Sequence, residues 1–279
     1  MHLEFVADEK DSTVEQALRR RGVSKRLISK LKRAEGGITL GGAHARSIDP
    51  VQAGDILAIS IDDLTSIEAS GGLCVPVVYE DEHVIIFNKP HSMPVHPSIK
   101  HRHDTLGNYF AYLLPGLTFR PINRLDRDTS GLCAVAKNAF AAKNLQYSIE
   151  KTYTAAVCGE IESGGVIDLP IARERESIIR RCVREDGKRA VTRYTPIASN
   201  EKYTLLEIHL DTGRTHQIRV HFSHIGFPLA GDDMYGGDMS DISRQSLHCS
   251  ALELIHPITH ERMSFSCELP QDIQSLFKK

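Results

Sequence analysis

The chain has 279 residues, of which 41% are hydrophobic and 25% are charged, and its net charge at pH 7 is −2. This length predicts one large domain and one small domain. No apolar run approaches the roughly 20 residues of a membrane span, and the first residues lack the apolar core of a secretory signal. We therefore expect a cytoplasmic protein with no membrane partner.

Two residue types that often carry chemistry show no functional spacing. The six cysteines are far apart and form no Cys-x-x-Cys pair, which predicts buried thiols in a reducing compartment. His216, His221 and His224 lack nearby carboxylates in the spacing of a zinc site. We expect no metal site.

Basic residues are concentrated near the amino terminus, where Glu35 is the single acid between residues 16 and 46. Ser12 and Glu15 have the spacing of a capping box and predict a first helix, and Ser24 predicts the cap of a second. Short strands are expected at 38–40 and 54–61. The bases form either an RNA-binding surface or a solvated helix face; the candidates for RNA contact are Arg19, Lys25, Arg26, Lys30, Lys32 and Arg33.

This arrangement resembles the small RNA-binding domain named after small-subunit ribosomal protein four. The similarity rests on the segment 22–26, Gly-Val-Ser-Lys-Arg, on the two helices and on the Gly54-Asp55 turn. Gly41-Gly42 stands where that family usually has Asn-Gly. The resemblance implies that the basic residues contact an RNA phosphate backbone.

We expect this domain to span residues 1–62, followed by a linker at 63–75 with small and polar residues and a Gly pair. The second domain, 76–279, is expected to be α+β, with a mixed, largely antiparallel sheet flanked by helices. Strands are predicted at 77–81, 83–90, 132–136, 153–157 and 204–210, and a helix at 139–149 with Phe140, Leu145 and Ile149 buried.

Asp126 is the first candidate for chemistry, in the segment 123–132, Asn-Arg-Leu-Asp-Arg-Asp-Thr-Ser-Gly-Leu. A carboxylate beside arginines stays ionised and can act as a nucleophile or a base. The same pattern is typical of a turn in which carboxylates and hydroxyls bond nearby backbone amides, and by itself it favours that simpler interpretation.

The segment is similar to the His-Arg-Leu-Asp-x-x-Thr-Ser-Gly signature of RluA-type pseudouridine synthases, with Asn123 in the histidine position. Residues 151–159 resemble the family's Lys-x-Tyr-x-Ala-x-Val-x-Gly strand, and residues 212–221 its third motif, in the same order along the chain. The resemblance implies a pseudouridine synthase fold and the isomerisation of uridine to pseudouridine in RNA. Such a reaction conserves every atom and needs no cofactor.

The resemblance also implies roles for single residues. Asp126 attacks the target nucleoside, Tyr153 stacks on its base, Arg219 pairs with Asp126, and Arg124 fills the gap left by the extruded base. Arg219 is expected one turn inside a helix capped by Thr215, with Ile218, Phe222 and Ile225 on one face. Without the resemblance, Tyr153 would be a plain core residue and Arg219 a surface arginine.

The expected substrate is structured RNA, more specifically large-subunit ribosomal RNA, bound by a monomer that has no DNA partner. Asn123 motivates an alternative, a catalytically inactive RNA-binding or ribosome-assembly protein of the same fold. A synthase directed to transfer RNA is a further alternative. A hydrolase that uses Asp126 with Asp128 is a third, although no second carboxylate is supported across a pocket.

Overall fold

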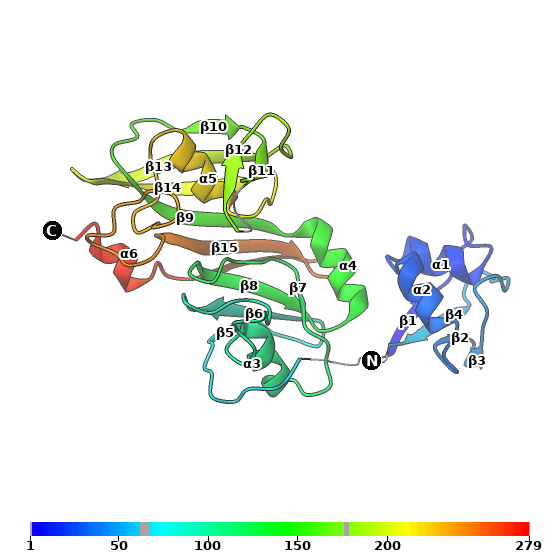
Figure 1. Ribbon diagram of the computed structural model, residues 1–279. Coiled ribbons are helices and arrows are strands. Elements are labelled where there is room, and N and C mark those ends of the chain that lie inside the picture. Colours follow the sequence, from blue (N-terminus) through cyan, green and yellow to red (C-terminus); the bar gives the residue numbers. More distant parts are fainter. Residues whose placement is uncertain (1, 62–66, 176–178, 279) are drawn as a thin grey trace.

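The computed structural model describes residues 2–61, 67–175 and 179–278. Two separate sheets organise the chain, one of four strands built from residues 2–60 and one of ten strands built from residues 77–266. Figure 1 shows the small sheet and its two helices beside α4 of the large unit. The predicted α+β class is confirmed.

The small unit has the strand order β1-β4-β2-β3, and every pair in it is antiparallel. The two helices cover one apolar cluster, in which Val14, Leu18, Leu27 and Leu31 are buried. The strand at the amino terminus was not predicted from the sequence. The elements are β1 (His2–Val6), α1 (Val14–Arg20), α2 (Lys25–Leu31), β2 (Ile38–Leu40), β3 (Ala43–His44) and β4 (Ile56–Ser60).

The two helix starts in this unit test the predicted caps. Ser24 caps α2 as expected, because its hydroxyl accepts a hydrogen bond from the Leu27 amide. The predicted Ser12 cap is wrong: Thr13 caps α1 and accepts from the Gln16 amide at 3.3 Å. Thr13 and Gln16 have the same spacing as Ser12 and Glu15, so the sequence contains two overlapping capping patterns.

The large sheet has the order β10-β13-β14-β9-β15-β8-β6-β5, with β16 paired to β15 and β7 paired to β8. Only the β8–β15 pair is parallel among the strands described here, so the sheet is mixed and largely antiparallel, as predicted. The strands are β5 (Val77–Glu80), β6 (Val84–Lys89), β7 (Arg120–Pro121), β8 (Ser130–Ala136), β9 (Glu150–Cys158), β10 (Gly165–Asp168), β13 (Val191–Ser199), β14 (Tyr203–Leu210), β15 (Leu247–Ile255) and β16 (Arg262–Ser266).

Four helices and a separate two-stranded hairpin complete the described part of the large unit. Every residue of β8 is buried, which explains its continuous run of small and apolar side chains. The remaining elements are α3 (Leu106–Leu113), α4 (Ala139–Ser148), α5 (Gln217–His224), α6 (Gln271–Ser275), and the hairpin strands β11 (Ile171–Arg173) and β12 (Arg181–Val183).

The helix α4 lies against both units. Leu145 is buried in the core of the large unit, as predicted, whereas Phe140 belongs to the apolar cluster of the small unit. The ring of Phe140 lies 5.7 Å from that of Phe5, and Lys143 donates a hydrogen bond to the Gly22 carbonyl at 3.0 Å. Different sides of α4 thus pack into two cores.

The expected boundary falls partly outside the described residues, which omit 62–66. From Ile67 onward the segment expected as a linker packs against the core of the large unit. Ile67 and Leu73 are partly buried there, and Val75 is fully buried. Of the helices that the structure describes, none has both the length and the apolarity needed to span a membrane.

Candidate active site

The loop that carries Asp126 is fastened to the sheet by the residue just before it. Asn123 is buried, and its side chain makes two hydrogen bonds to the backbone of β8. The side-chain amide nitrogen donates to the Leu132 carbonyl at 2.9 Å, and the side-chain oxygen accepts from the Ala134 backbone amide at 2.8 Å. Asn123 therefore has a structural role at the base of the loop, whatever the residue type usual in this position.

A buried lysine, Lys89, is hydrogen-bonded to the backbone of the same loop and of the segment after β6. The Lys89 ammonium group donates to the carbonyls of Pro90 and Met93, both at 2.8 Å, and of Arg127 at 3.1 Å. Burial lowers the pKa of Lys89 to about 8. Sequence reasoning did not assign Lys89 a role, although a lysine that ends the apolar strand 84–89 is unusual unless its charge is satisfied.

The loop leads into β8 through a glycine. Gly131 has a φ of 109°, and a Cβ atom there would lie 2.3 Å from the Cys249 carbonyl oxygen of β15. Only glycine fits this close approach. The Ser130-Gly131 pair of the motif thus allows β8 and β15 to meet beside the loop.

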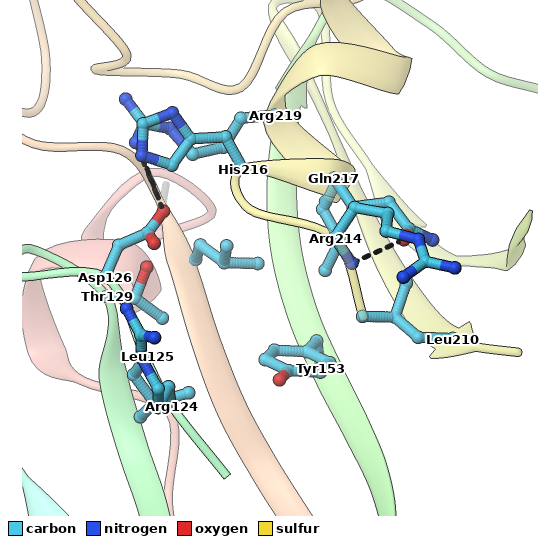
Figure 2. Close-up of a pocket in the computed structure, with 12 residues that line it drawn as sticks. Arg124, Leu125, Asp126, Thr129, Tyr153, Leu210, Arg214, His216, Gln217 and Arg219 are labelled. Carbon is cyan, nitrogen blue, oxygen red and sulfur yellow. Dashed lines mark hydrogen bonds and ion pairs between the residues drawn. The ribbon is translucent and has the colours of Figure 1, made fainter. Parts of the chain in front are cut away.

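The Asp126 carboxylate projects from the loop toward α5, as Figure 2 shows. Its Oδ2 atom lies 3.2 Å from Nη1 of Arg219 and 3.7 Å from Nε2 of His216. The side chain of Asp126 remains 28% exposed, whereas those of Arg219 and His216 are almost fully buried. The contact expected between Arg219 and Asp126 is present, and it leaves the carboxylate open to the cavity.

Arg219 makes its bidentate contact with Asp232 rather than with Asp126. Its Nε and Nη2 atoms donate to the two oxygens of Asp232 at 2.6 and 2.8 Å, and the Asp232 side chain is completely buried. Burial alone would lower the pKa of Arg219, but the hydrogen bonds and charge of Asp232 outweigh it, and the pKa is raised. Arg219 is thus held by Asp232 and presents its remaining edge to Asp126.

The start of α5 differs from the predicted Thr215 cap. The N-cap residue is His216, which has a left-handed φ of 58° and makes no side-chain capping hydrogen bond. Its ring instead shares a 2.8 Å hydrogen bond with the Tyr235 hydroxyl through Nδ1. Burial lowers the pKa of His216, with the Asp126 charge acting in the opposite direction. The backbone turn directs the imidazole toward Asp126.

Tyr153 lies on β9 and lines the same cavity as Asp126, Arg124 and Arg219. It is 6% exposed, and burial raises the pKa of its hydroxyl well above the usual range. The ring is therefore neutral at physiological pH and forms an apolar wall of the cavity (Figure 2). Segments far apart in the sequence, the 123–130 loop, β9 and α5, together build one site.

The comparisons with known proteins agree with this arrangement. Residues 83–224 match the model of the RNA pseudouridylate synthase family. A Bacillus subtilis protein named uncharacterized RNA pseudouridine synthase YjbO is 38% identical over 278 residues, covering 95% of this chain and 98% of its own. The chain belongs to the RNA pseudouridylate synthase family. It is an isomerase of the RluA and RluD type that acts on RNA.

Two further relatives extend the comparison. The ribosomal large subunit pseudouridine synthase D of Pseudomonas aeruginosa is 38% identical over 266 residues, with 85% of this chain and 82% of that protein covered. The solved structure of human RNA pseudouridylate synthase domain containing 1 superposes with a TM-score of 0.60 at 26% identity, covering 72% of this chain and 86% of that one.

The other residues that the sequence suggested for catalysis or RNA contact lie at the surface of this pseudouridine synthase. Arg124 is exposed at the mouth of the cavity. The Asp128 carboxylate is bound by the neighbouring Arg127 at 2.8 Å, which leaves it a poor partner for the hydrolase considered above. The six amino-terminal bases, all exposed, belong to the other unit: Arg19, Lys25, Arg26, Lys30, Lys32 and Arg33.

Sequence reasoning missed Asp232, His216 and Tyr235 as parts of this site. Asp232 follows a glycine in the segment 231–237, and Tyr235 lies in the same segment. The Arg219 guanidinium carbon lies 5.0 Å from the centre of the Tyr235 ring. Nothing in the spacing of the segment 231–237 along the chain indicates that it approaches Arg219.

Proposed function

We propose that Asp126 is the catalytic residue of this pseudouridine synthase and that its substrate is a uridine of large-subunit ribosomal RNA. The observation that carries the first part is the pairing of Asp126 with the buried Arg219 in a cavity walled by Tyr153. A carboxylate held in this way has a fixed orientation toward whatever enters the cavity.

The reaction begins with removal of the target nucleotide from its stack, because ribose carbon 1 and base carbon 5 are inaccessible there. Extrusion costs a few kcal/mol. Stacking of the uracil on the Tyr153 ring offsets it by roughly 1 to 3 kcal/mol. Arg124, exposed beside the cavity, fills the space that the base leaves in the RNA.

Asp126 then acts on the sugar. It either attacks ribose carbon 1 with departure of the uracil, or removes a sugar proton so that a glycal forms. The detached uracil rotates within the cavity and joins ribose carbon 1 through its carbon 5, and in the first route this step breaks the bond between carbon 1 and Asp126. The proton on carbon 5 leaves, a proton returns to nitrogen 1, and in the second route the sugar recovers its own, so all atoms balance.

Arg219 and Asp232 position the carboxylate for this chemistry. The bidentate contact with Asp232 fixes the guanidinium plane, and the remaining nitrogen of Arg219 fixes one oxygen of Asp126. His216 lies 3.7 Å from the same oxygen and adds a second contact to it. The second Asp126 oxygen is the one we assign to the sugar.

Two observations support the ribosomal target. Several relatives, including the Pseudomonas aeruginosa protein, are named ribosomal large subunit pseudouridine synthase D. The small amino-terminal unit also carries six exposed bases on and beside its two helices, as expected for an RNA-binding domain of the S-four-like type. We propose that this unit docks the enzyme on a folded RNA element near the target.

The test is a map of pseudouridines in a strain that lacks the gene, complemented with the wild type or with Asp126→Ala. We expect the wild type to restore one or a few sites in large-subunit ribosomal RNA, and the variant to restore none. Asp211→Asn is the control, because this exposed carboxylate pairs with Arg193 and is not one of the residues that line the cavity. Restoration of every site by Asp126→Ala would refute the catalytic role.

A second assay separates chemistry from binding. Purified wild-type protein should release tritium from RNA labelled at uridine carbon 5, and Asp126→Ala should bind the same RNA without releasing it. If the wild-type protein binds the labelled RNA but releases no tritium, the alternative of an inactive RNA-binding protein is favoured. Lost sites confined to transfer RNA would identify a synthase with that other target.

A further inference from the structure

A second hollow, distinct from the cavity around Asp126, lies beside the active site. Its charged walls come from three segments: Arg173 and Arg181 from the β11–β12 hairpin, Lys188 from the following loop, and Arg214 from the turn before α5. We call it the basic groove. Its volume of about 490 Å³ admits a nucleotide-sized group.

The hairpin places two positive charges directly opposite each other. Arg173 and Arg181 are paired residues in the antiparallel register of β11 and β12, so their side chains leave the same face. The two guanidinium groups therefore place positive charge on the same wall of the groove. Among the described residues that line the groove, Asp186 is the one acid, and its carboxylate is bound to Arg184.

Lys188 is held in place by its backbone. Its amide and carbonyl exchange hydrogen bonds of 2.9 Å with Ile171 of β11. The preceding Gly187 permits this contact, because a Cβ atom there would lie 2.6 Å from the Ile171 carbonyl carbon. The Gly187-Lys188 pair therefore brings a lysine to a defined place in the groove wall.

The basic groove is continuous with the active site. Arg214 and Thr215 line the groove and also the cavity that contains Asp126 and Tyr153. The Arg214 guanidinium is fixed by a 3.0 Å hydrogen bond from its Nε atom to the Arg189 carbonyl. A chain that passes from one hollow to the other must run past this guanidinium.

We propose that the basic groove binds backbone phosphates of the RNA strand next to the target uridine. Four bases on three segments match a polyanion that runs across the surface, and Arg173, Lys188 and Arg214 are exposed along its path. The contact holds the strand while the uridine occupies the Asp126 cavity. This inference rests on the proposed catalytic role of Asp126, but not on which RNA is the substrate.

The first test compares the double variant Arg173→Gln/Lys188→Gln with a matched control, Lys202→Gln/Arg262→Gln. The control removes two exposed bases that pair with Asp241 and Glu253 and line neither hollow. The probe is a synthetic RNA fragment centred on the uridine found by the mapping. We expect the groove variant to raise Kd about tenfold or more, and the control to leave it nearly unchanged.

Salt dependence and rate give independent readouts. Each lost phosphate contact should reduce the slope of log K against log salt by about 0.7 on a single strand. The single-turnover rate at saturating RNA should stay within about twofold of the wild type, since the groove does not contain the reacting atoms. An unchanged Kd and salt slope would overturn the proposal.

The second test locates the phosphate. Individual phosphates on either side of the target are replaced by neutral methylphosphonates, and each RNA is measured with the wild type and the groove variant. We expect one or two positions where the losses are not additive, as for groups in direct contact. Additive losses at every position would overturn the proposal, and binding of inorganic phosphate dependent on Arg173 and Lys188 would then assign the groove to a free anion.

Failure of this inference is distinguishable from failure of the proposed function. A wrong RNA target appears in the pseudouridine map, and the fragment is chosen after that map. A wrong role for Asp126 appears as tritium release by Asp126→Ala, which leaves the groove intact.

Discussion

At the scale of single residues, the site depends on a line of alternating charges. Asp126, Arg219 and Asp232 form a carboxylate, guanidinium and carboxylate series in which exposure decreases from 28% at Asp126 to zero at Asp232. The inner pair is stabilised by two charge-assisted hydrogen bonds. The outer carboxylate is thereby oriented without being buried, so it can reach a substrate.

Asp232→Asn tests the inner end of this line. The change removes the buried counter-charge of Arg219 and leaves it only the partly exposed Asp126, so we expect a loss of about 3–5 kcal/mol in the free energy of unfolding. Where the variant folds, the single-turnover rate should fall on the order of 100-fold because Asp126 is no longer held in place, while Kd for RNA stays near the wild-type value. Denaturant titration and stopped assays on one preparation measure both.

The control for this prediction is Asp238→Asn, an exposed carboxylate in the same loop that accepts hydrogen bonds only from Ser240 among the described contacts. It should change neither stability nor rate appreciably. A folded Asp232→Asn protein with the wild-type rate would show that Arg219 does not need Asp232 to orient Asp126.

The residues that sequence analysis recovered and missed follow a physical pattern. Asp126, Tyr153 and Arg219 lie in motifs recognisable along the chain, so their presence in one site could be predicted. Asp232 contacts Arg219 through the tertiary fold, and no spacing rule connects a loop carboxylate with a helix arginine 13 residues earlier. Asn123, which departs from the family motif, has a structural role because its side chain is hydrogen-bonded to β8.

At the scale of elements, local propensity predicted the type of each segment, helix or strand, more accurately than the residue at which the segment begins. The helix before Gly226 was expected, but its cap was assigned to Thr215 because threonine is a frequent N-cap residue. His216 takes this place in a left-handed conformation, which propensity disfavours and contacts with Tyr235 and Asp126 favour. Helix α4 was likewise expected, but not that Phe140 would pack against the other unit.

The junction of β8 and β15 makes a pH-dependent contribution to stability. His248 on β15 is buried and shares a 2.9 Å hydrogen bond with the Ser130 hydroxyl at the start of β8. Burial lowers the pKa of His248 to about 4 from an ordinary value of 6.5. Between these two pH values the unfolded chain binds a proton that the folded chain does not, so stability falls as the pH drops from 6.5 toward 4.

The expected loss from this one group across the window is about 3 kcal/mol. Urea titrations at pH 7 and pH 4.5 on the wild type and on His248→Gln measure it, because glutamine does not titrate and the other groups contribute equally to both proteins. The wild type should lose more stability on acidification than the variant. Parallel pH dependence in the two proteins would mean that His248 does not carry this effect.

At the scale of the whole molecule, a net charge of −2 conceals two separate basic surfaces. One is formed by the exposed bases of the amino-terminal unit, and the other is the basic groove beside the active site. Electrostatic attraction to RNA is therefore local and directional rather than general. The two surfaces belong to different folded units, so we expect each to contact a different part of the RNA.

The triple variant Lys25→Gln/Lys32→Gln/Arg33→Gln tests this division, since all three bases are exposed on or next to α2. We expect weaker RNA binding and a smaller salt slope, with the single-turnover rate at saturating RNA unchanged. Combined with Arg173→Gln/Lys188→Gln, the losses in binding free energy should add, because the two sets share no contact and lie in different units. Strong non-additivity, or a slower rate in the triple variant, would instead mean that the amino-terminal unit acts at the active site itself.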